Sequence, residues 1–490
     1  MYPRAAQCDA ETCQRTSRFT AFPPMSSTAI SPFLAAPAVV PILDPGFRPA
    51  ALATRAFARV ATVPVTLALE QADGSVFHHA FRVLDAGHPA AGANAFFVER
   101  LSKFLLWAWG GFRIHLAGPI ALADGLRRHY SETAVGRFDS EIIGERIYDR
   151  PIEVVSVESA DQLPVPRSNT APLGRHWNGC RIGFDLGGSD RKVAAVIDGN
   201  CVFSEETVWD PYFQPDPAYH FEGVMDSLRK AAAHLPRVDA IGGSAAGVYV
   251  NNRVKVASLF RGVPRDLFDS RVKDLFLELR RAWNGIPFDV VNDGEVTALA
   301  ASMSLGCNSV LGIALGTSTA AGFVTAEGNI TTWLNELAFN PIDYRIGAPP
   351  DEWSGDGGCG VQYFSQQAVG RLIPFSDLEI DSKLPLPEQL KAVQARMLEG
   401  DERASRIYQT LGTYLGYGLA HYSDFYDFRN VLILGRVTSG PGGDLILAGA
   451  REVLDREFPE LSSRTAFHIP DEKDKRHGQA FAAASLPVIN

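Results

Sequence analysis

A turn with two adjacent glycines follows a short apolar strand near the middle of the sequence. The strand ends at Asp185, the turn contains Gly187, Gly188 and Ser189, and residues 191–197 continue as a second strand. Glycines in such a turn let backbone N–H groups approach a phosphate closely. A carboxylate facing the same cavity can hold a hydrated Mg²⁺. An ordinary hairpin with a Gly-Gly turn is the alternative that this segment leaves open by itself.

A second segment repeats this arrangement. Residues 310–315 are strand-like, Gly316, Thr317 and Ser318 form a turn, and residues 322–324 return as a strand. Each turn alone could be structural. Two of them in one chain indicate duplicated halves that clamp a polyphosphate between them.

An acidic residue stands between the two turns, where a strand meets a helix. Residues 288–291 form the strand, Asn292 and Asp293 follow it, and residues 295–303 have a helical pattern. A carboxylate there can reach into a cleft and accept a proton from a substrate hydroxyl during phosphoryl transfer. Asp is also a good helix cap, so cap and catalyst both remain open.

The elements around these segments divide the chain. Residues 1–50 read as a disordered tail rich in Pro, Ala and Ser, and residues 51–159 as a compact α/β accessory domain that begins with a β-hairpin around Asp73-Gly74. No chemistry is visible in that domain. Residues 160–178, with several prolines, are predicted to be a linker.

Composition narrows the class of protein. The 490 residues carry a formal net charge of −10, which disfavours nucleic-acid binding by bulk electrostatics. No uninterrupted apolar run is long enough for a membrane-spanning helix. The 6 cysteines lack paired metal-ligand spacing, which favours a reduced, cytoplasmic protein. Arginines in the tail leave organelle transit open, and Met1 and Met25 are both candidate start residues.

The motifs together resemble the ROK family (repressors, open reading frames, kinases) of the actin-like ATPase superfold. The resemblance runs from Gly179 to the end and depends on motifs in the family's order. These are Phe184 to Ser189, Asn292-Asp293 before an alanine-rich helix, Leu315 to Ser318, the adenosine segment Val431 to Val437, and Gly478-Gln479-Ala480. The resemblance implies an α/β, actin-like (ribonuclease H-like) bilobal fold after the accessory domain. Kinase lobe I would cover residues 179–298 and lobe II residues 299–490, with the terminal helix returning to lobe I.

The same resemblance assigns roles to individual residues. Asp293 would be the general base on a sugar hydroxyl, Asn292 would orient the substrate, and Asp185 would carry Mg²⁺ through water. The other assigned residues fall into two sets. Those that would hold the phosphates and adenosine of ATP are Gly187, Gly188, Ser189, Gly316, Thr317, Ser318, Gly435 and Arg436. Those that would contact the substrate are Glu336, Asn251 and Asn252.

The sequence departs from the family in the sugar- and zinc-binding segment. Glu336 is present, but the family's zinc- and sugar-binding His is Phe339, and only Cys359 remains of the family's cysteine cluster. Structural zinc needs about four N or S ligands, so we predict no zinc site. The substrate loop between residues 243 and 262 also lacks the family's usual Asn, which predicts weakened recognition of an ordinary hexose.

Two hypotheses of function follow. The first is an ATP- and Mg²⁺-dependent carbohydrate kinase that phosphorylates a hydroxyl of a sugar or polyol-like molecule. The second is a non-catalytic, ligand-sensing ROK protein that signals through its N-terminal domain. Family members that act as repressors carry a winged helix-turn-helix, which residues 57–157 do not resemble, so we expect no nucleic-acid partner. A homodimer is compatible with the sequence, and no membrane association is expected.

Overall fold

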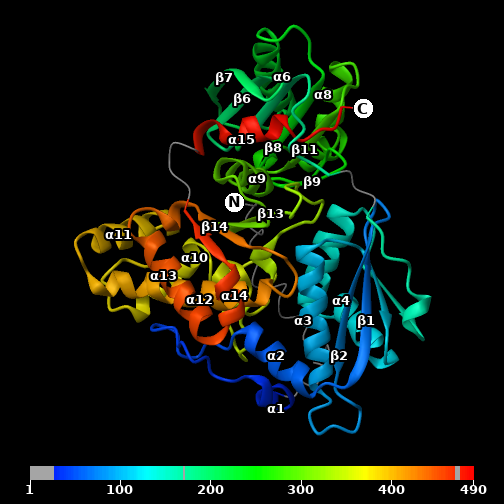
Figure 1. Cartoon of the computed structure of the whole chain (residues 1–490), viewed down its shortest axis with the longest axis vertical. Coiled ribbons are helices and arrows are strands. Elements are labelled where there is room, and N and C mark those ends of the chain that lie inside the picture. Colours follow the sequence, from blue (N-terminus) through cyan, green and yellow to red (C-terminus); the bar gives the residue numbers. More distant parts are fainter. Residues whose placement is uncertain (1–26, 169–171, 470–474, 490) are drawn as a thin grey trace, which may run out of the picture.

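The computed structural model describes residues 27–168, 172–469 and 475–489. Figure 1 shows an upper lobe built on the sheet of β5–β8 and β11, a lower lobe around β12–β15, and an N-terminal block beside the lower lobe. No helix within the described ranges combines the length and the apolar character needed to span a membrane.

The first lobe contains a five-stranded mixed sheet with the order β11-β8-β5-β6-β7. Strands β5, β6 and β7 form an antiparallel meander, and β8 and β11 run parallel to β5. The elements of this lobe are β5 (Cys180–Leu186), β6 (Asp190–Ile197), β7 (Asn200–Val208), α6 (Pro217–Ala232), β8 (Ala240–Ala245), β9 (Val248–Val250), β10 (Arg253–Val256), α7 (Arg265–Leu267), α8 (Leu275–Ala282) and β11 (Phe288–Asn292). Strand β5, at the centre of the sheet, is buried along its whole length, including Arg181 and Asp185.

The second lobe repeats the pattern with one strand fewer, in the order β13-β12-β14-β15. Strand β13 is antiparallel to β12, while β14 and β15 continue in parallel. Its elements are β12 (Val310–Leu315), β13 (Thr319–Val324), α10 (Gln366–Leu372), α11 (Leu386–Leu398), α12 (Glu402–Tyr422), β14 (Asn430–Leu434), α13 (Gly442–Glu457), α14 (Pro459–Arg464) and β15 (Ala466–His468). Two sheets of the same construction confirm the expected α/β fold of duplicated halves.

Helix α9 (Asp293–Leu305) lies between the two lobes (Figure 1). A Cβ on Gly322 of β13 would overlap the carbonyl oxygen of Gly294, so glycine permits the helix to sit directly on the strand. Helix α9 also shares a buried cluster with α15 (Lys475–Ala484), including Leu299 and Ala483. Helix α9 is therefore packed both on β13 of the second lobe and on the terminal helix.

The terminal helix α15 packs on the sheet of the first lobe. A Cβ on Gly183 of β5 would overlap the carbonyl oxygen of Ala480, and one on Gly242 of β8 would overlap that of Ala483. Only glycine at these two positions lets the helix approach the sheet this closely.

Replacing Gly242 by Ala is expected to lower the free energy of unfolding by about 1–3 kcal/mol or more, because the added methyl forces α15 away from the sheet. Chemical denaturation measures the change. Gly125→Ala is the matched control, since a Cβ there meets nothing within 4 Å in helix α4 and should stabilise the helix by about 0.5–1 kcal/mol. Equal stability of Gly242→Ala and the wild type would contradict this packing.

The N-terminal block (residues 27–168) contains a four-stranded mixed sheet with the order β2-β1-β3-β4. Its elements are α1 (Ser27–Ile30), α2 (Ala50–Val60), β1 (Val63–Glu70), β2 (Val76–Val83), α3 (Ala93–Ala108), β3 (Arg113–Ala117), α4 (Ile120–Glu132), α5 (Ala134–Asp139), the π-helix η2 (Ser140–Ile147) and β4 (Glu153–Val157). The predicted hairpin is β1–β2, paired from Val63–Val83 to Glu70–Val76.

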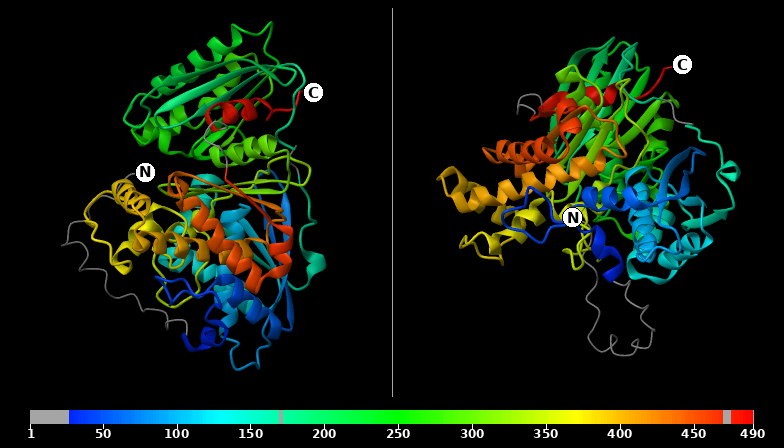
Figure 2. Two further views of the ribbon diagram at one scale, coloured as in Figure 1. Left: turned by 60° about the vertical axis from the view of Figure 1, so that its left-hand side comes forward. Right: turned by 60° about the horizontal axis from the view of Figure 1, so that its bottom comes forward.

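The block does not stand apart from the second lobe. One continuous buried cluster contains side chains of both. Phe104 of α3 stacks on Phe425 at a centroid distance of 4.0 Å, and Trp107 stacks on Phe339 at 4.1 Å. Both views in Figure 2 show the blue-to-cyan block against the yellow-to-orange lobe. The shared core makes α3 a structural part of lobe II.

Residues 27–50 differ from the tail predicted for residues 1–50. Phe47 is fully buried among aromatic rings, and the Asp44 carboxylate accepts a hydrogen bond of 2.6 Å from the Tyr414 hydroxyl. Arg345 and Arg371 also contact Asp44. The prolines of this segment predicted an extended tail. Its packing partners could not be inferred from the local sequence, because they lie about 300 or more positions later in the chain. Residues 1–26 of the predicted tail lie outside the described residues.

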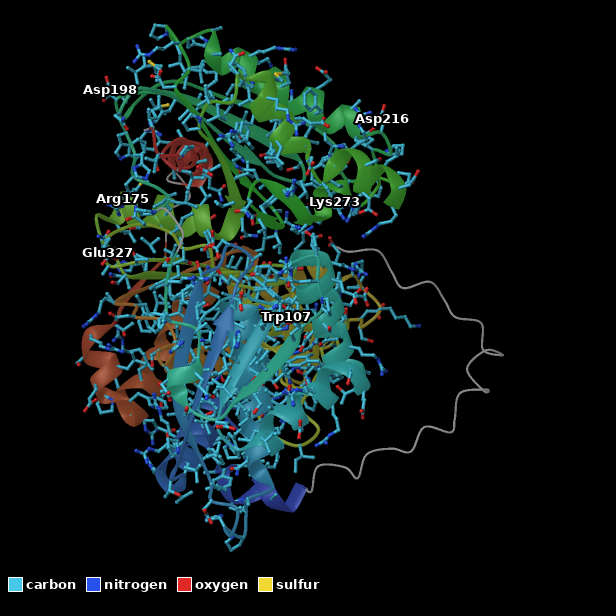
Figure 3. All side chains as sticks on the ribbon, turned by 90° about the vertical axis from the view of Figure 1, so that its right-hand side faces the viewer. Trp107, Arg175, Asp198, Asp216, Lys273 and Glu327 are labelled. Atoms are coloured by element: carbon cyan, nitrogen blue, oxygen red, sulfur yellow. The ribbon has the colours of Figure 1, made fainter. Side chains whose placement is uncertain are left out.

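The predicted linker covers residues 160–178. Its two described parts, residues 160–168 and 172–178, each pair with another part of the structure. Arg167 pairs with Val76 of the N-terminal block, and Leu173 pairs with Ile330 of the second lobe. The Arg175 guanidinium donates to the Ser302 hydroxyl at 2.7 Å and to the Asn308 side chain at 2.8 Å. Figure 3 labels Arg175 at the junction of the two lobes.

Candidate functional site

The first glycine turn joins β5 to β6, as predicted. The Gly187 N–H donates to the Asp190 carbonyl at 2.9 Å and closes the turn, while the Trp209 indole N–H donates to the Gly187 carbonyl at 2.8 Å. A Cβ on Gly188 would overlap the Tyr212 hydroxyl. Ser189 is exposed at the tip of the turn. The turn is thus held from behind by two aromatic residues, with its tip open to a ligand.

The second glycine turn and the adenosine segment meet at one edge of the second sheet. Strands β12 and β14 are parallel neighbours, so Gly316 and Gly435 follow their adjacent carboxyl ends. Gly435 has φ +100°, and a Cβ there would lie 2.5 Å from the Leu315 carbonyl oxygen. Thr317, Ser318 and Arg436 are exposed beside it. The structure therefore brings the predicted phosphate and adenosine residues of this lobe together.

Asp185 lies at the carboxyl end of β5, next to the equivalent end of β8. The Ser244 hydroxyl donates to one Asp185 oxygen at 2.6 Å, and the Lys192 ammonium lies 3.7 Å from the other. Burial raises the pKa of Asp185, while Ser244 and Lys192 act in the opposite direction. One carboxylate and bound phosphates are a common arrangement for a hydrated Mg²⁺. Asp185 therefore fits the predicted role of holding the ion through water.

Asp293 is the first residue of α9, directly after β11. Because β5, β8 and β11 are parallel, their carboxyl ends place Asp185, Ser244 and Asn292 at one edge of the sheet. Burial raises the pKa of Asp293 to about 6, and the nearby Asp185 carboxylate adds to this shift. A carboxyl group with a pKa near neutrality is suited to act as a general base at physiological pH.

Two further acidic residues belong to the surroundings of Asp293, namely Glu295 of α9 and Glu336 of the second lobe. Burial raises the pKa of Glu336 to about 7, with a further contribution from Asp293, and raises that of Glu295 to about 8. The Asn335 amide donates to Glu295 at 2.8 Å, and the Tyr426 hydroxyl donates to Asn335 at 3.0 Å. Sequence reasoning found Asp293 and Glu336 but missed Glu295. Its place two residues after Asp293 was the only available signal.

The three asparagines predicted to contact the substrate have different surroundings in the structure. The Asn292 side chain accepts from the Gly294 N–H at 2.7 Å and donates to the Gly247 carbonyl at 2.8 Å, so it caps α9. Asn252 accepts from the Val290 N–H at 2.7 Å and donates to the Phe288 carbonyl at 2.6 Å. Both amides thus bind backbone of the site. Asn251 is exposed, with φ +51° in the turn between β9 and β10.

The loop that carries Glu336 is attached to the N-terminal block. The Glu336 N–H donates to the Trp107 carbonyl at 3.0 Å, and the Asn335 N–H donates to the Ala108 carbonyl at 2.9 Å. Phe339 stacks on Trp107. The end of α3 therefore supports the acidic loop. Sequence reasoning did not find this contact, since nothing local pairs α3 with a loop so distant in the chain.

The absence of zinc stays a prediction. Cys359 is fully buried, and burial raises the pKa of its thiol well above the ordinary value. Within the described ranges, His, Cys, Asp and Glu side chains form no group of three or more that could hold a metal ion directly.

A cavity of about 370 Å³ lies beside the acidic residues. Asn292 and Glu295, which flank Asp293, are part of its wall, although Asp293 and Glu336 themselves are not. The other lining residues are Gln71, Ala72, Asp73, Tyr148, Leu173, Gly247, Val248, Tyr249, Val250, Asn251, Asn252, Asp289, Val290, Val291, Thr331, Thr332, Trp333, Leu334 and Val488. Its size falls within the range of about 300–1,000 Å³ that is typical of small-molecule sites.

No protein-family model matches the chain, and no curated protein matches it. Solved structures are similar to it. A ROK hexokinase from Thermus thermophilus is 19% identical over 63% of this chain and 97% of that chain, with a TM-score of 0.49. A ROK family glucokinase from Streptomyces griseus, solved with glucose and AMPPNP, is 20% identical over 62% of this chain and 98% of that one, with a TM-score of 0.44.

A ROK family transcriptional regulator, described as a homologue of the E. coli MLC protein, is 17% identical over 63% of this chain and 78% of that chain, with a TM-score of 0.48. More than a third of this chain lies outside each of these matches. All three of these solved structures are described as ROK family proteins.

Proposed function

We propose that this chain is an ATP-dependent kinase of the ROK type that phosphorylates a hydroxyl group of a sugar or polyol-like small molecule. The observation that carries the proposal is Asp293. Its carboxyl group has a pKa raised to about 6, and it lies in one acidic cluster with Asp185 and Glu336. Glycine turns follow β5 in lobe I and β12 in lobe II, and backbone N–H groups in such turns suit the binding of a polyphosphate donor.

The proposed reaction transfers one proton and one phosphoryl group. The Asp293 carboxylate takes the proton of the acceptor hydroxyl as its oxygen bonds to the γ-phosphorus of ATP. The bond from that phosphorus to the β–γ bridging oxygen breaks, and ADP leaves. Backbone N–H groups at Gly187 to Ser189 and at Gly316 to Ser318 would hold the phosphates. Mg²⁺, held by Asp185 through water, would neutralise part of their charge.

ATP turnover by the full chain with Mg²⁺ tests the proposal. Purified protein is incubated with a library of sugars and polyols, and the release of ADP is measured for each. At least one member is expected to stimulate ADP release tenfold or more over the rate without acceptor. If no member stimulates ADP release, the kinase assignment fails.

The pH dependence of turnover should report the raised pKa. A general base acts only when ionised, so kcat/KM is expected to be level above pH about 6 and to fall about tenfold per pH unit below it. An Asp with the ordinary value of 3.8 would keep kcat/KM level to nearly pH 4. Circular dichroism at each pH controls for unfolding, and a level profile down to pH 5 would contradict the raised pKa.

A specific observation favours the sensor as a second candidate. The N-terminal block shares a buried core with lobe II, so a ligand that moves this lobe would also move the block. Calorimetry distinguishes the two functions. Tight binding of ATP with Mg²⁺ supports the kinase, whereas binding of a sugar by a protein that binds no nucleotide supports the sensor.

A further inference from the structure

The C-terminal end of α3 is capped by a loop that lies far away in the sequence. Gly110, with φ +82°, follows the helix, whose last carbonyls have no partner within the helix itself. The Trp107 carbonyl accepts a hydrogen bond of 3.0 Å from the Glu336 N–H. The Ala108 carbonyl accepts one of 2.9 Å from the Asn335 N–H. The place of the Glu336 backbone is therefore set by the end of a helix of the N-terminal block.

One face of α3 fixes where this end of the helix lies. Arg100, Lys103 and Trp107 are three and four residues apart, so they share that face. The Asp139 carboxylate accepts from the Lys103 ammonium at 3.0 Å and from the Trp107 indole N–H at 2.9 Å. Asp356 lies 3.0 Å from Arg100 and 3.2 Å from Lys103. Because all five side chains are buried, a shift of the helix would separate buried charges from their partners.

The far end of the Glu336 loop is connected to the same face. A short 3₁₀ helix (Leu337–Phe339) follows Glu336 and ends at Asn340. The Asn340 carbonyl accepts a hydrogen bond of 2.9 Å from the N–H of Gly360, a few residues after Asp356. The loop is thus held at its start by the carbonyls of α3, and at its end by a segment that α3 binds through Asp356.

The Trp107 side chain also contacts the loop directly. Its ring stacks on Phe339 at a centroid distance of 4.1 Å and an interplanar angle of 25°. Phe138 completes this aromatic contact, with ring centroids 6.3 Å from Trp107 and 5.7 Å from Phe339. Figure 3 labels Trp107 within the N-terminal block. Trp107 therefore joins the loop to the buried Asp139 through its carbonyl, its ring and its indole N–H.

The place of Glu336 matters because of its relation to Asp293. The Asp293 charge contributes to the raised pKa of Glu336, so the two carboxyl groups interact electrostatically. They belong to different elements, since Asp293 begins α9 and Glu336 lies in a loop of lobe II. Support of that loop therefore decides how the two groups are spaced. A misplacement of about 1 Å in a positioning group can cost about 10²-fold in rate.

We propose that Trp107 is a positioning residue for Glu336, and that the N-terminal block is thereby a working part of the acceptor side of the site. This inference rests on the proposed kinase function, because it takes Glu336 as a group that contacts the acceptor. Trp107 is only 1% exposed, so it acts through the loop and not on a ligand.

Steady-state kinetics of full-length Trp107→Phe, with the most effective acceptor of the sugar and polyol library, tests this role. The substitution keeps a ring beside Phe339 and removes the indole N–H that binds Asp139. The KM of the acceptor is expected to rise at least fivefold, while the KM of ATP stays within twofold of the wild type. A merely structural role would lower kcat with the fraction of folded protein and leave the acceptor KM unchanged.

Two further variants complete the comparison. Trp109→Phe is the matched control, because within the described part of the chain the buried indole N–H of Trp109 has no hydrogen-bond partner to lose. It should leave the acceptor KM within twofold of the wild type. Phe138→Leu is a milder variant for the case that Trp107→Phe does not fold, since Phe138 is half-buried. It removes one ring of the contact and should raise the acceptor KM at least threefold.

Hydrogen exchange, followed by mass spectrometry, tests the same support without turnover. Peptides that cover residues 335–340 report the N–H groups that α3 holds. They are expected to exchange at least tenfold faster in Trp107→Phe than in the wild type or in Trp109→Phe. Peptides of β12 should exchange at the wild-type rate, whereas a global loss of stability would accelerate both. Wild-type exchange of residues 335–340 in both Trp107→Phe and Phe138→Leu overturns the proposal.

Failure of this inference and failure of the kinase assignment are distinguishable. If no acceptor stimulates ADP release, the kinase assignment falls, and the exchange of residues 335–340 still decides whether Trp107 holds the Glu336 loop. If turnover is observed and Trp107→Phe leaves the acceptor KM within twofold of the wild type, the positioning role is overturned while the kinase stands.

Discussion

Asp293→Asn is expected to lower turnover by about 10²–10⁴-fold, the usual contribution of a positioned general base. The amide keeps the size of the side chain at the start of α9 but cannot accept the hydroxyl proton. Asn292 caps the helix, and that hydrogen bond is independent of the substitution. Affinity for ATP should therefore stay within about twofold of the wild type. Steady-state kinetics and calorimetry measure the two quantities.

The control for this substitution is Asp266→Asn. Asp266 is exposed on the short helix α7 of lobe I and makes no contact with the acidic cluster. It should retain full turnover and nucleotide affinity. If Asp293→Asn kept more than a tenth of the wild-type turnover, Asp293 would have only a structural role at the start of α9. Another group would then have to serve as the base.

Lys103→Met is expected to lower the free energy of unfolding by about 3–5 kcal/mol, the usual cost of removing one partner of a buried ion pair. The Lys103 side chain is fully buried and its ammonium lies 3.0 Å from both Asp139 oxygens and 3.2 Å from Asp356. Burial alone lowers the pKa of Lys103, but the two carboxylates overcome this and raise the pKa above its ordinary value. Its removal leaves carboxylates without their shared cation.

Guanidinium chloride unfolding, followed by circular dichroism, measures this loss. Lys391→Met is the matched control, because the Lys391 side chain is 70% exposed in its pair with Glu388 and should matter little. A double substitution sharpens the test. Lys103→Met with Asp139→Leu removes Lys103 together with its nearer carboxylate, while Asp356 keeps its ion pair with Arg100. This double substitution should recover part of the stability, since it leaves no buried Asp139 carboxylate without its cation. A loss below 1 kcal/mol for Lys103→Met alone would contradict the ionic role.

Much of the fold of the two lobes could be predicted from the sequence. The strand that ends at Asp185, the turn after it and the helix after Asp293 all appear as β5, the β5–β6 turn and α9. These features depend on neighbours along the chain: an apolar run, a glycine turn and a helix cap. The observed bounds of these elements differ from the predicted ones by only a few residues.

The segment before residue 50 could not be predicted in the same way. Its prolines and alanines indicate an extended tail, yet Asp44 and Phe47 have partners in lobe II. No local pattern encodes such a contact, because the energy comes from side chains that meet only after the chain has folded. The contacts between the N-terminal block and lobe II could not be predicted for the same reason. Arg100 of α3 and its partner Asp356, for example, are 256 positions apart in the sequence.

The sequence by itself determined the two glycine turns and the acid that stands between them in the chain, because glycine turns and helix starts are local features whose order is read directly. Only the tertiary structure decided the pKa of Asp293, the support of the Glu336 loop by Trp107, and the cavity wall formed by the turn Gln71–Asp73. Each of these depends on burial or on contact between distant segments. Burial and contact are properties of the packed chain rather than of any stretch of it.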